Sequence, residues 1–423
     1  MANLPAQSNQ QIFQALTQRI PGGVNSPFRG FQAVGGTPPV MVRGQGARVW
    51  DVEGNQYLDF CCAWGPLMLG HSHPILREAA SQALQEGMVF GASTPWELEF
   101  AEAICDAYPS IQQVRLVNSG AEAVASALRV ARGATRRARI LKFEGCYHGH
   151  VECLDAVGLE AEANGGALAL GASPGSAGET LVADFNSLES VEKLLRQHFR
   201  EVAAVIVEPI PGSMGVVRPA TGFLTGLREL CDEHGSLLIF DEVLSGSRVA
   251  RGGAQQLFQV RPDLTCLGKA LAGGMPIGAY GGQSRWMSQL APVGKVYQAG
   301  TFCGNPVTVR CAIANLKLLS EPDGYLPLAS QTEWLTQALK PLDPHLQCVA
   351  YPGMFSLYFA PREISSHLDL EAVDLARFAT LYHHLLKRGI YLPPSCLDAA
   401  GISLVHTRSD LESFVEAVRE GLS

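Results

Sequence analysis

Short apolar segments alternate with longer amphipathic segments through the middle of the chain, from Glu97 to about Cys311. Apolar runs of about four to eight residues that end in turn residues are typical of buried strands. Amphipathic segments between such runs are typical of helices that connect parallel strands. The pattern therefore predicts an α/β fold with a mostly parallel sheet flanked by helices. The predicted strands are 113–117, 138–143, 202–207, 236–240 and 264–267.

The two ends of the chain have a different pattern. Residues 10–19 predict a helix, 20–27 a loop rich in glycine and proline, and 49–59 a hairpin with a Gly-Asn turn. A helix predicted at 312–319 leads into mixed strands and helices, so we expect the terminal segments to form a smaller α+β domain. The expected parts are an N-terminal segment 1–60, a large domain 61–310 and a C-terminal small domain 311–423.

Composition narrows the class of protein. The net charge is −8, from 32 basic and 40 acidic residues, and there is no basic run interleaved with aromatic residues, so we expect no nucleic-acid partner. No segment resembles a signal peptide or an apolar span of about twenty residues, which predicts a cytoplasmic protein with no membrane partner. Several of the eleven cysteines lie in apolar runs, as buried reduced thiols do. The His71/His73 and His148/His150 pairs lack further ligands nearby, so no metal site is expected.

Two charged residues follow two of the predicted strands. Asp241 ends the run that starts at Ser236, and Lys269 ends the run that starts at Leu264. Polar groups at the carboxyl ends of parallel strands face the crevice in which open α/β sheets bind ligands. Pyridoxal 5'-phosphate (PLP) needs an amine that forms a Schiff base and an acid that keeps its pyridine nitrogen protonated. A structural ion pair under a loop is the alternative, because such pairs are also common.

Four further loops carry candidate cofactor contacts. The turn at Ser119 leads from a strand into a helix, where free N–H groups and the helix dipole favour phosphate, although Ser119 could simply be the N-cap. Tyr147 could stack on a flat ring or be a half-buried loop aromatic. Glu208 could orient cofactor groups or belong to a structural network. Thr301 could donate to a phosphate or stabilise its turn. Their agreement on one phosphorylated aromatic aldehyde favours PLP.

Over nearly its whole length the chain resembles the class III (ω-type) aminotransferases, a group of PLP enzymes of fold type I. The resemblance is carried by ten motifs: 21–29, 64–66, 70–74, 118–120, 143–150, 241–243, 266–269, 273–279, 297–301 and 304–306. Motifs of this length, in this order, are specific for the fold and the cofactor.

The resemblance implies a role for each matching residue. Lys269 would bind the cofactor and shuttle protons, Asp241 would hold the pyridinium, and Tyr147 would pack on the ring. Thr301 would reach the phosphate of the neighbouring subunit, so a homodimer with shared active sites is implied. The remaining cofactor contacts implied are the backbone of Ser119, Gly120 and Ala121, together with Glu208 and Ser213.

The resemblance also implies a substrate site for a small amino aldehyde or amino acid. Arg29 would bind the substrate carboxylate, a task suited to a guanidinium group, and Ser26, Trp64 and Asp398 would complete the site. The implied reaction moves an amino group within one molecule and uses the pyridoxamine form of the cofactor. The alternative is a two-substrate aminotransferase for another amino or β-amino acid. A PLP-binding protein without turnover is a third reading, against which Lys269 and Asp241 argue.

The chain departs from the group's usual pattern at several positions. Ala121 replaces a threonine, Ser213 replaces an asparagine, and Asp398 replaces a glutamate. The segment 157–184, which corresponds to a loop that gates the site, is altered at 173–177, and a serine of that loop falls at about Gly165. These departures bear on the substrate and the type of reaction more than on the cofactor.

Overall fold

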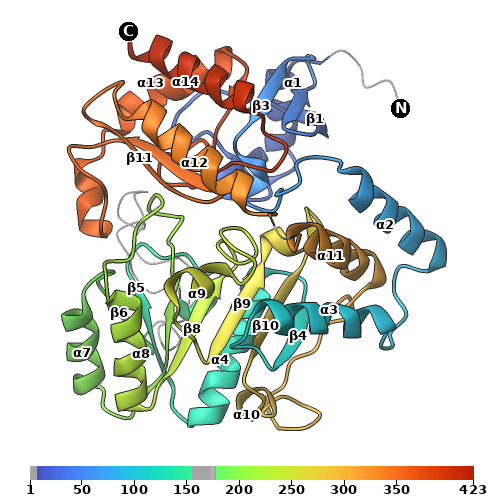
Figure 1. Ribbon diagram of the computed structural model, residues 1–423, viewed down its shortest axis with the longest axis vertical. Coiled ribbons are helices and arrows are strands. Elements are labelled where there is room, and N and C mark those ends of the chain that lie inside the picture. The colour runs from blue at the N-terminus through green and yellow to red at the C-terminus, as the bar shows by residue number, and fades with distance from the viewer. Residues whose placement is uncertain (1–6, 155–172, 174, 176–177, 322) are drawn as a thin grey trace. The chain divides into compact units, whose positions relative to one another are not determined.

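The computed structural model describes residues 7–154, 173, 175, 178–321 and 323–423, and its chain divides into two compact units (Figure 1). The central unit comprises Ile75–Tyr325 and Ile364–Glu371. The terminal unit comprises Met1–Pro74, Leu326–Glu363 and Ala372–Ser423. Among the described residues, no helix is both long and apolar enough to cross a membrane.

A seven-stranded sheet forms the centre of the central unit, in the order β4-β10-β9-β8-β7-β5-β6. Its strands pair in parallel except at β10, which is antiparallel to both neighbours. The predicted mostly parallel sheet is therefore confirmed. The strands are β4 (Gln113–Val117), β5 (Arg139–Phe143), β6 (Thr180–Ala183), β7 (Val202–Val207), β8 (Leu237–Glu242), β9 (Leu264–Gly268) and β10 (Gly278–Gly282).

Helices flank this sheet. The apolar residues of α4 pack on β9, β10 and β7, while α7 and α8 lie side by side near β6 and β8 (Figure 1). All six residues of β7 and of β8 are buried, which explains the continuous apolar run of β7 and the apolar residues 237–240 of β8. The helices of the central unit are α2 (Pro74–Glu86), α3 (Pro95–Ala107), α4 (Gly120–Thr135), α7 (Leu188–Gln197), α8 (Phe223–His234), α9 (Gly253–Phe258), α10 (Ser284–Met287) and α11 (Pro306–Leu319).

Strand β10 was not predicted because its sequence, Gly-Ala-Tyr-Gly-Gly, is typical of a loop. Its glycines allow close approach of neighbouring strands: a Cβ atom at Gly281 would lie 2.8 Å from the carbonyl oxygen of Gln113 on β4. The strand exists because of this tertiary packing. Helix α11 also differs from the predicted 312–319, since it begins at Pro306, where the Asn305 side chain caps it by accepting from the N–H of Thr308 at 3.0 Å.

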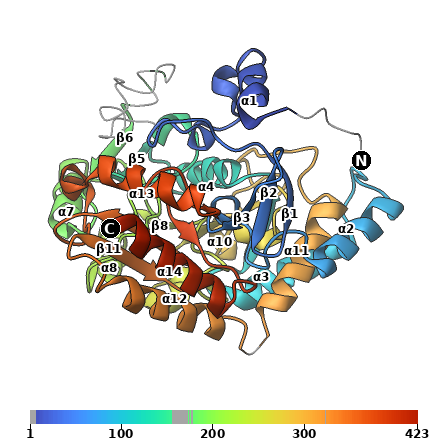
Figure 2. The same ribbon diagram turned by 90° about the horizontal axis from the view of Figure 1, so that it is seen from above.

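The terminal unit contains two small sheets, in the orders β1-β2-β3-β13 and β11-β12-β14, and β1, β2 and β3 lie side by side in Figure 2. The predicted hairpin is confirmed, with Val49 opposite Tyr57. The strands are β1 (Met41–Gln45), β2 (Arg48–Asp51), β3 (Gln56–Asp59), β11 (Leu346–Tyr351), β12 (Met354–Phe359), β13 (Ile390–Tyr391) and β14 (Ala400–Gly401). The helices are α1 (Asn9–Thr17), α12 (Leu326–Leu339), α13 (Leu375–Lys387) and α14 (Arg408–Leu422).

Candidate active site

Asp241 is the buried acid at the carboxyl edge of the central sheet. It lies inside β8, opposite Cys266 of β9, and only 4% of it is exposed. Its Oδ2 atom is 2.7 Å from Nδ1 of His148, and its Oδ1 atom accepts the N–H of Val243 at 3.1 Å. A buried carboxylate requires such donors. Both oxygens of Asp241 are thus held in place by neighbouring groups.

His148 is completely buried beside this carboxylate. Burial lowers the pKa of its imidazole, and the charge of Lys142 lowers it further, while the bond to Asp241 acts in the opposite direction. A neutral imidazole carries one N–H, and a carboxylate can only accept, so the bonding assigns the proton to Nδ1. His148 is therefore a neutral donor to Asp241.

Glu208 is a second buried carboxyl group at the same edge. It follows β7, the neighbour of β8, and accepts the backbone N–H of Tyr147 at 2.8 Å. Burial raises the pKa of Glu208 to about 8, and the nearby Asp241 charge adds to this effect. At neutral pH Glu208 consequently holds a proton.

Lys269 directly follows β9 and starts a short 3-10 helix, Lys269–Ala272. Its backbone is left-handed, with φ of 40°, an unfavourable conformation for a residue with a side chain. The fully buried Asn315 holds this turn, since its Nδ2 atom donates to the carbonyls of Ala270 and Leu271 at 2.7 and 3.0 Å. The half-buried side chain of Lys269 is thus attached to a turn whose backbone is held in place.

The N-terminus of α4 lies at the same edge. Ser119 is its N-cap and accepts the N–H of Glu122 at 3.2 Å, so the capping role is real. The N–H groups of Gly120 and Ala121, in the first turn, have no intrahelical acceptor and are suited to an anion. A Cβ atom at Gly120 would lie 2.7 Å from Cγ1 of Val243, so this turn packs tightly against the segment after β8.

The other predicted cofactor residues lie in loops of the central unit. Tyr147 is 40% exposed, Ser213 is half-buried and Thr301 is exposed. The Thr301 loop contacts the start of the α4 turn, because Nδ2 of Asn118 is 3.5 Å from Sγ of Cys303.

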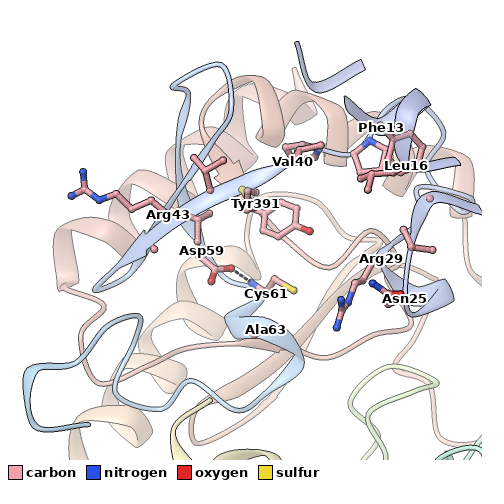
Figure 3. A pocket seen from close by; sticks show the side chains of 18 of the residues that line it. Phe13, Leu16, Asn25, Arg29, Val40, Arg43, Asp59, Cys61, Ala63 and Tyr391 are labelled. Carbon is pink, nitrogen blue, oxygen red and sulfur yellow. Dashed lines mark hydrogen bonds between the residues drawn. The ribbon is translucent and has the colours of Figure 1, made fainter. Parts of the chain in front are cut away.

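The predicted substrate residues belong to the terminal unit. Arg29 and Trp64 line a cavity of about 580 Å³, and Figure 3 shows Arg29 beside Asn25 in it. Trp64 follows two residues that also have a left-handed backbone, and its buried indole N–H has no hydrogen-bond partner among the described residues. Ser26 and Asp398 are described but do not line this cavity.

The sequence pattern missed two residues of this site, His148 and Asn315. In the sequence His148 stands out only as one of a histidine pair that could bind a metal, and Asn315 lies inside a helix without any motif. The predicted gating segment falls largely on 155–172, 174 and 176–177, outside the described residues.

The residues of the central unit fit PLP by their chemistry. The α4 turn offers N–H groups for a phosphate, Asp241 is an acid for a pyridine nitrogen, and Lys269 is an amine for an aldehyde. A Cβ atom at Gly268 would lie 3.2 Å from Cγ1 of Val243 and 3.7 Å from Cα of Gly120. The end of β9, the segment after β8 and the start of α4 therefore meet at this point.

Comparisons with known proteins agree with this chemistry. The profile of the family described as aminotransferase class-III matches residues 31–390. Glutamate-1-semialdehyde 2,1-aminomutase of Nitrosospira multiformis is 47% identical over 414 residues, 95% of this chain and 96% of that protein. The protein of that name from Desulforamulus reducens is 44% identical over 421 residues, 97% of this chain and 96% of that protein. The structure of an omega-transaminase from Sphaerobacter thermophilus has a TM-score of 0.90 and 31% identity, covering 99% of this chain and 98% of that chain.

Proposed function

The chain belongs to the class-III aminotransferase family, and we propose that it is a PLP-dependent glutamate-1-semialdehyde 2,1-aminomutase. The reaction converts (S)-4-amino-5-oxopentanoate to 5-aminolevulinate, a tetrapyrrole precursor, by moving the amino group within one molecule through a 4,5-diamino intermediate. The observation that carries the proposal is near full-length identity of 44 and 47% to proteins of this name. The arrangement of Asp241, Lys269 and the α4 turn supports the cofactor.

The central unit supplies the groups that hold the cofactor. PLP, when bound, supplies an electron sink that makes a C–H bond beside the substrate nitrogen acidic. Asp241, fixed by His148 and Val243, would hold the pyridine nitrogen in its protonated form. The N–H groups of Gly120 and Ala121 would bind the phosphate, and the exposed ring of Tyr147 offers a stacking surface.

Lys269 moves the protons in this proposal. Its amine is a general base when neutral and returns the proton as a general acid, so one group can serve both halves of an amino exchange. The buried turn behind it, held by Asn315, limits where the amine can lie. Glu208 remains protonated near neutral pH, so this buried acid adds no negative charge beside Asp241.

Arg29 is the proposed carboxylate-binding residue. It is exposed to the cavity of the terminal unit, where a guanidinium group can form two parallel hydrogen bonds with a carboxylate. Trp64 also lines this cavity. Ser26 and Asp398 remain part of the proposed substrate site on the strength of the family resemblance.

We also propose a homodimer in which Thr301 binds the phosphate of the partner subunit's cofactor. Tyr297 and Phe302, beside Thr301, are 71% and 60% exposed, and exposed aromatic side chains of this kind mark protein interfaces. The test mixes two inactive variants, Lys269→Ala and Thr301→Asp. Regained activity supports shared sites, because one site of a mixed dimer has both residues intact. Mixtures that stay inactive although mixed dimers form would refute active sites shared between the two subunits.

The cytoplasmic location and the lack of nucleic-acid or membrane partners remain predictions.

The decisive experiment supplies purified protein with glutamate-1-semialdehyde and no amino donor or keto acid. Sustained formation of 5-aminolevulinate is expected, because the aminomutase needs no second substrate. A single half-turnover that continues only after a donor or acceptor is added would instead identify a two-substrate aminotransferase. That alternative is supported by the likeness to the omega-transaminase structure.

A further inference from the structure

Asp59, at the end of β3, holds the start of a turn in the terminal unit. Its Oδ1 atom accepts the backbone N–H groups of Cys61 and Cys62 at 2.9 and 3.0 Å, and Figure 3 shows the first of these bonds. Its Oδ2 atom is 2.7 Å from Nε2 of His71. The side chain of Asp59 is only 4% exposed, so these contacts take the place of water. One carboxylate thus joins both ends of the segment 61–71.

The turn itself has an unfavourable backbone. Cys62, Ala63 and Trp64 have φ of 46°, 54° and 60°, and elsewhere in the described part of the chain no two consecutive non-glycine residues are left-handed. A Cβ atom makes this conformation unfavourable. The turn's own backbone bonds, at 2.9 and 3.1 Å, do not explain it, because a right-handed turn forms bonds between the same positions. Contacts outside the turn must therefore hold it.

His71 keeps the Asp59 carboxylate in place. The N–H and carbonyl of His71 pair with Gly46, between β1 and β2, at 2.8 and 2.9 Å. A Cβ atom at Gly44 would lie 2.5 Å from Nδ1 of His71, so the imidazole packs closely on β1. The ring consequently has little room to move. It fixes Oδ2 of Asp59 while Oδ1 holds the turn.

We propose that Asp59 and His71 are a positioning pair for the substrate cavity: they hold the left-handed turn 62–64 in the conformation that places Trp64 at the cavity wall. Trp64 and Arg29 line the same cavity. The inference rests on the proposed function, which assigns Trp64 to the substrate site. Asp59 and His71 also border the cavity, but on this proposal they act through the turn and do not touch the substrate.

The test follows Trp64 by ¹⁹F NMR of protein that carries 5-fluorotryptophan, with the signal assigned by Trp64→Phe. In Asp59→Ala the signal should shift or broaden, because the turn is released. In Asp59→Asn it should stay, because the amide oxygen still accepts both N–H groups. The KM for the amino aldehyde should rise about tenfold in Asp59→Ala while kcat changes by less than about threefold, as for lost ground-state binding.

Ala63→Gly separates the strain of the turn from other effects of Asp59→Ala. Ala63 is exposed, and glycine adopts its φ of 54° readily. In the double variant Asp59→Ala/Ala63→Gly the left-handed turn costs less. We therefore expect the Trp64 signal to return toward its wild-type position. A double variant whose signal stays that of Asp59→Ala would contradict the proposal.

Two substitutions of His71 decide the question if Asp59→Ala does not fold. His71→Leu removes the partner of Oδ2, whereas His71→Gln places an amide nitrogen near the position of Nε2. We expect the Trp64 signal to change in His71→Leu and to stay in His71→Gln.

The matched control is Asp51→Ala. Asp51 is a buried aspartate at the end of β2, and its carboxylate accepts from the Asn55 N–H and the Tyr57 hydroxyl, both at 2.9 Å. Its loss should destabilise the same small sheet without moving Trp64. A change of the Trp64 signal as large as in Asp59→Ala would overturn the proposal, because the effect would then reflect general destabilisation.

An unchanged Trp64 signal in folded Asp59→Ala, or in His71→Leu where Asp59→Ala does not fold, would also overturn the proposal. So would a changed signal with an unchanged KM, because the turn would then have no part in substrate binding. The NMR readout needs neither substrate nor cofactor. If the wild type makes no 5-aminolevulinate, the proposed function fails while the hold of Asp59 on Trp64 is still tested.

Discussion

The side chain of Ala121 lies against the backbone of Gly149, so closely that a Cβ atom at Gly149 would come within 2.6 Å of the Ala121 Cβ. Gly149 also has φ of 73°, which favours glycine. Ala121 belongs to the proposed phosphate-binding turn, and Gly149 follows the loop residues Tyr147 and His148. The contact therefore joins the phosphate-binding turn to the loop that positions Asp241.

Replacing Gly149 with alanine should weaken PLP binding by about tenfold or more and lower the free energy of unfolding by roughly 2 to 3 kcal/mol. The added methyl group meets both a steric conflict with Ala121 and an unfavourable backbone angle. The matched control is Gly222→Ala, whose φ is 84° but whose Cβ would meet nothing within 4 Å. It should cost only about 1 kcal/mol and leave PLP binding unchanged. Titration with PLP and urea unfolding measure both quantities; equal PLP affinities in the two variants would contradict the argument.

Glu208 should make the apoprotein less stable as pH rises. Its pKa is about 8 in the folded protein and ordinarily 4.5, so between these values the folded state keeps a proton that the unfolded chain has lost. The free energy of unfolding then falls by about 1.4 kcal/mol per pH unit, or about 3 kcal/mol between pH 5.5 and 7.5. This contribution should vanish in Glu208→Gln.

Urea unfolding of the apoprotein at the two pH values measures the effect. The control is Glu201→Gln, an exposed carboxylate whose pKa is lowered by its bond to Arg139 and which is ionised throughout this range. It should keep the wild-type dependence on pH. If Glu208→Gln also keeps it, the carboxyl group is not protonated in the folded protein.

Arg29→Ala should raise the KM for the amino aldehyde by roughly 10- to 100-fold, because a hydrogen bond to a carboxylate contributes about 1.5 to 3 kcal/mol. The absorbance of bound PLP should not change. Arg43→Ala is a suitable control, since Arg43 lines the same cavity but its guanidinium group lies over the ring of Trp50 at 4.4 Å. Steady-state kinetics measure the KM of both variants. If the two KM values agree, Arg29 does not bind the substrate carboxylate.

Lys269→Ala should abolish formation of 5-aminolevulinate while the protein still binds PLP through the α4 turn and Asp241. The bound cofactor should then be removable by gel filtration, because no amine remains at that position to attach it. Absorbance before and after filtration, with an activity assay, measures both effects. Turnover at the wild-type rate would contradict the whole scheme.

The sequence predicted the parts of the fold that depend on local pattern. Strands β7, β8 and β9 are buried throughout, so each is largely apolar. Asp241 comes directly after the apolar residues of β8, and Lys269 directly follows β9. Strand β10 could not be predicted in this way. Its glycines serve the close approach of adjacent strands, which is a property of the assembled sheet.

The site could be predicted only where a residue type indicates its chemistry. Lysine and aspartate at strand ends do so, whereas His148 meets Asp241 across 93 residues of sequence and Asn315 meets Ala270 across 45. Nothing local to either residue indicates that contact. Arg29 was assigned from the family resemblance alone, because an arginine in an exposed loop has many uses.

The left-handed backbone at Lys269 implies a conflict between stability and activity at a single position. A glycine there would relieve about 1 kcal/mol of backbone strain and make the folded protein more stable. It would also remove the amine on which the proposed chemistry depends. Selection for stability alone would favour glycine at this position, so the proposed catalytic role would account for a lysine in this unfavourable conformation.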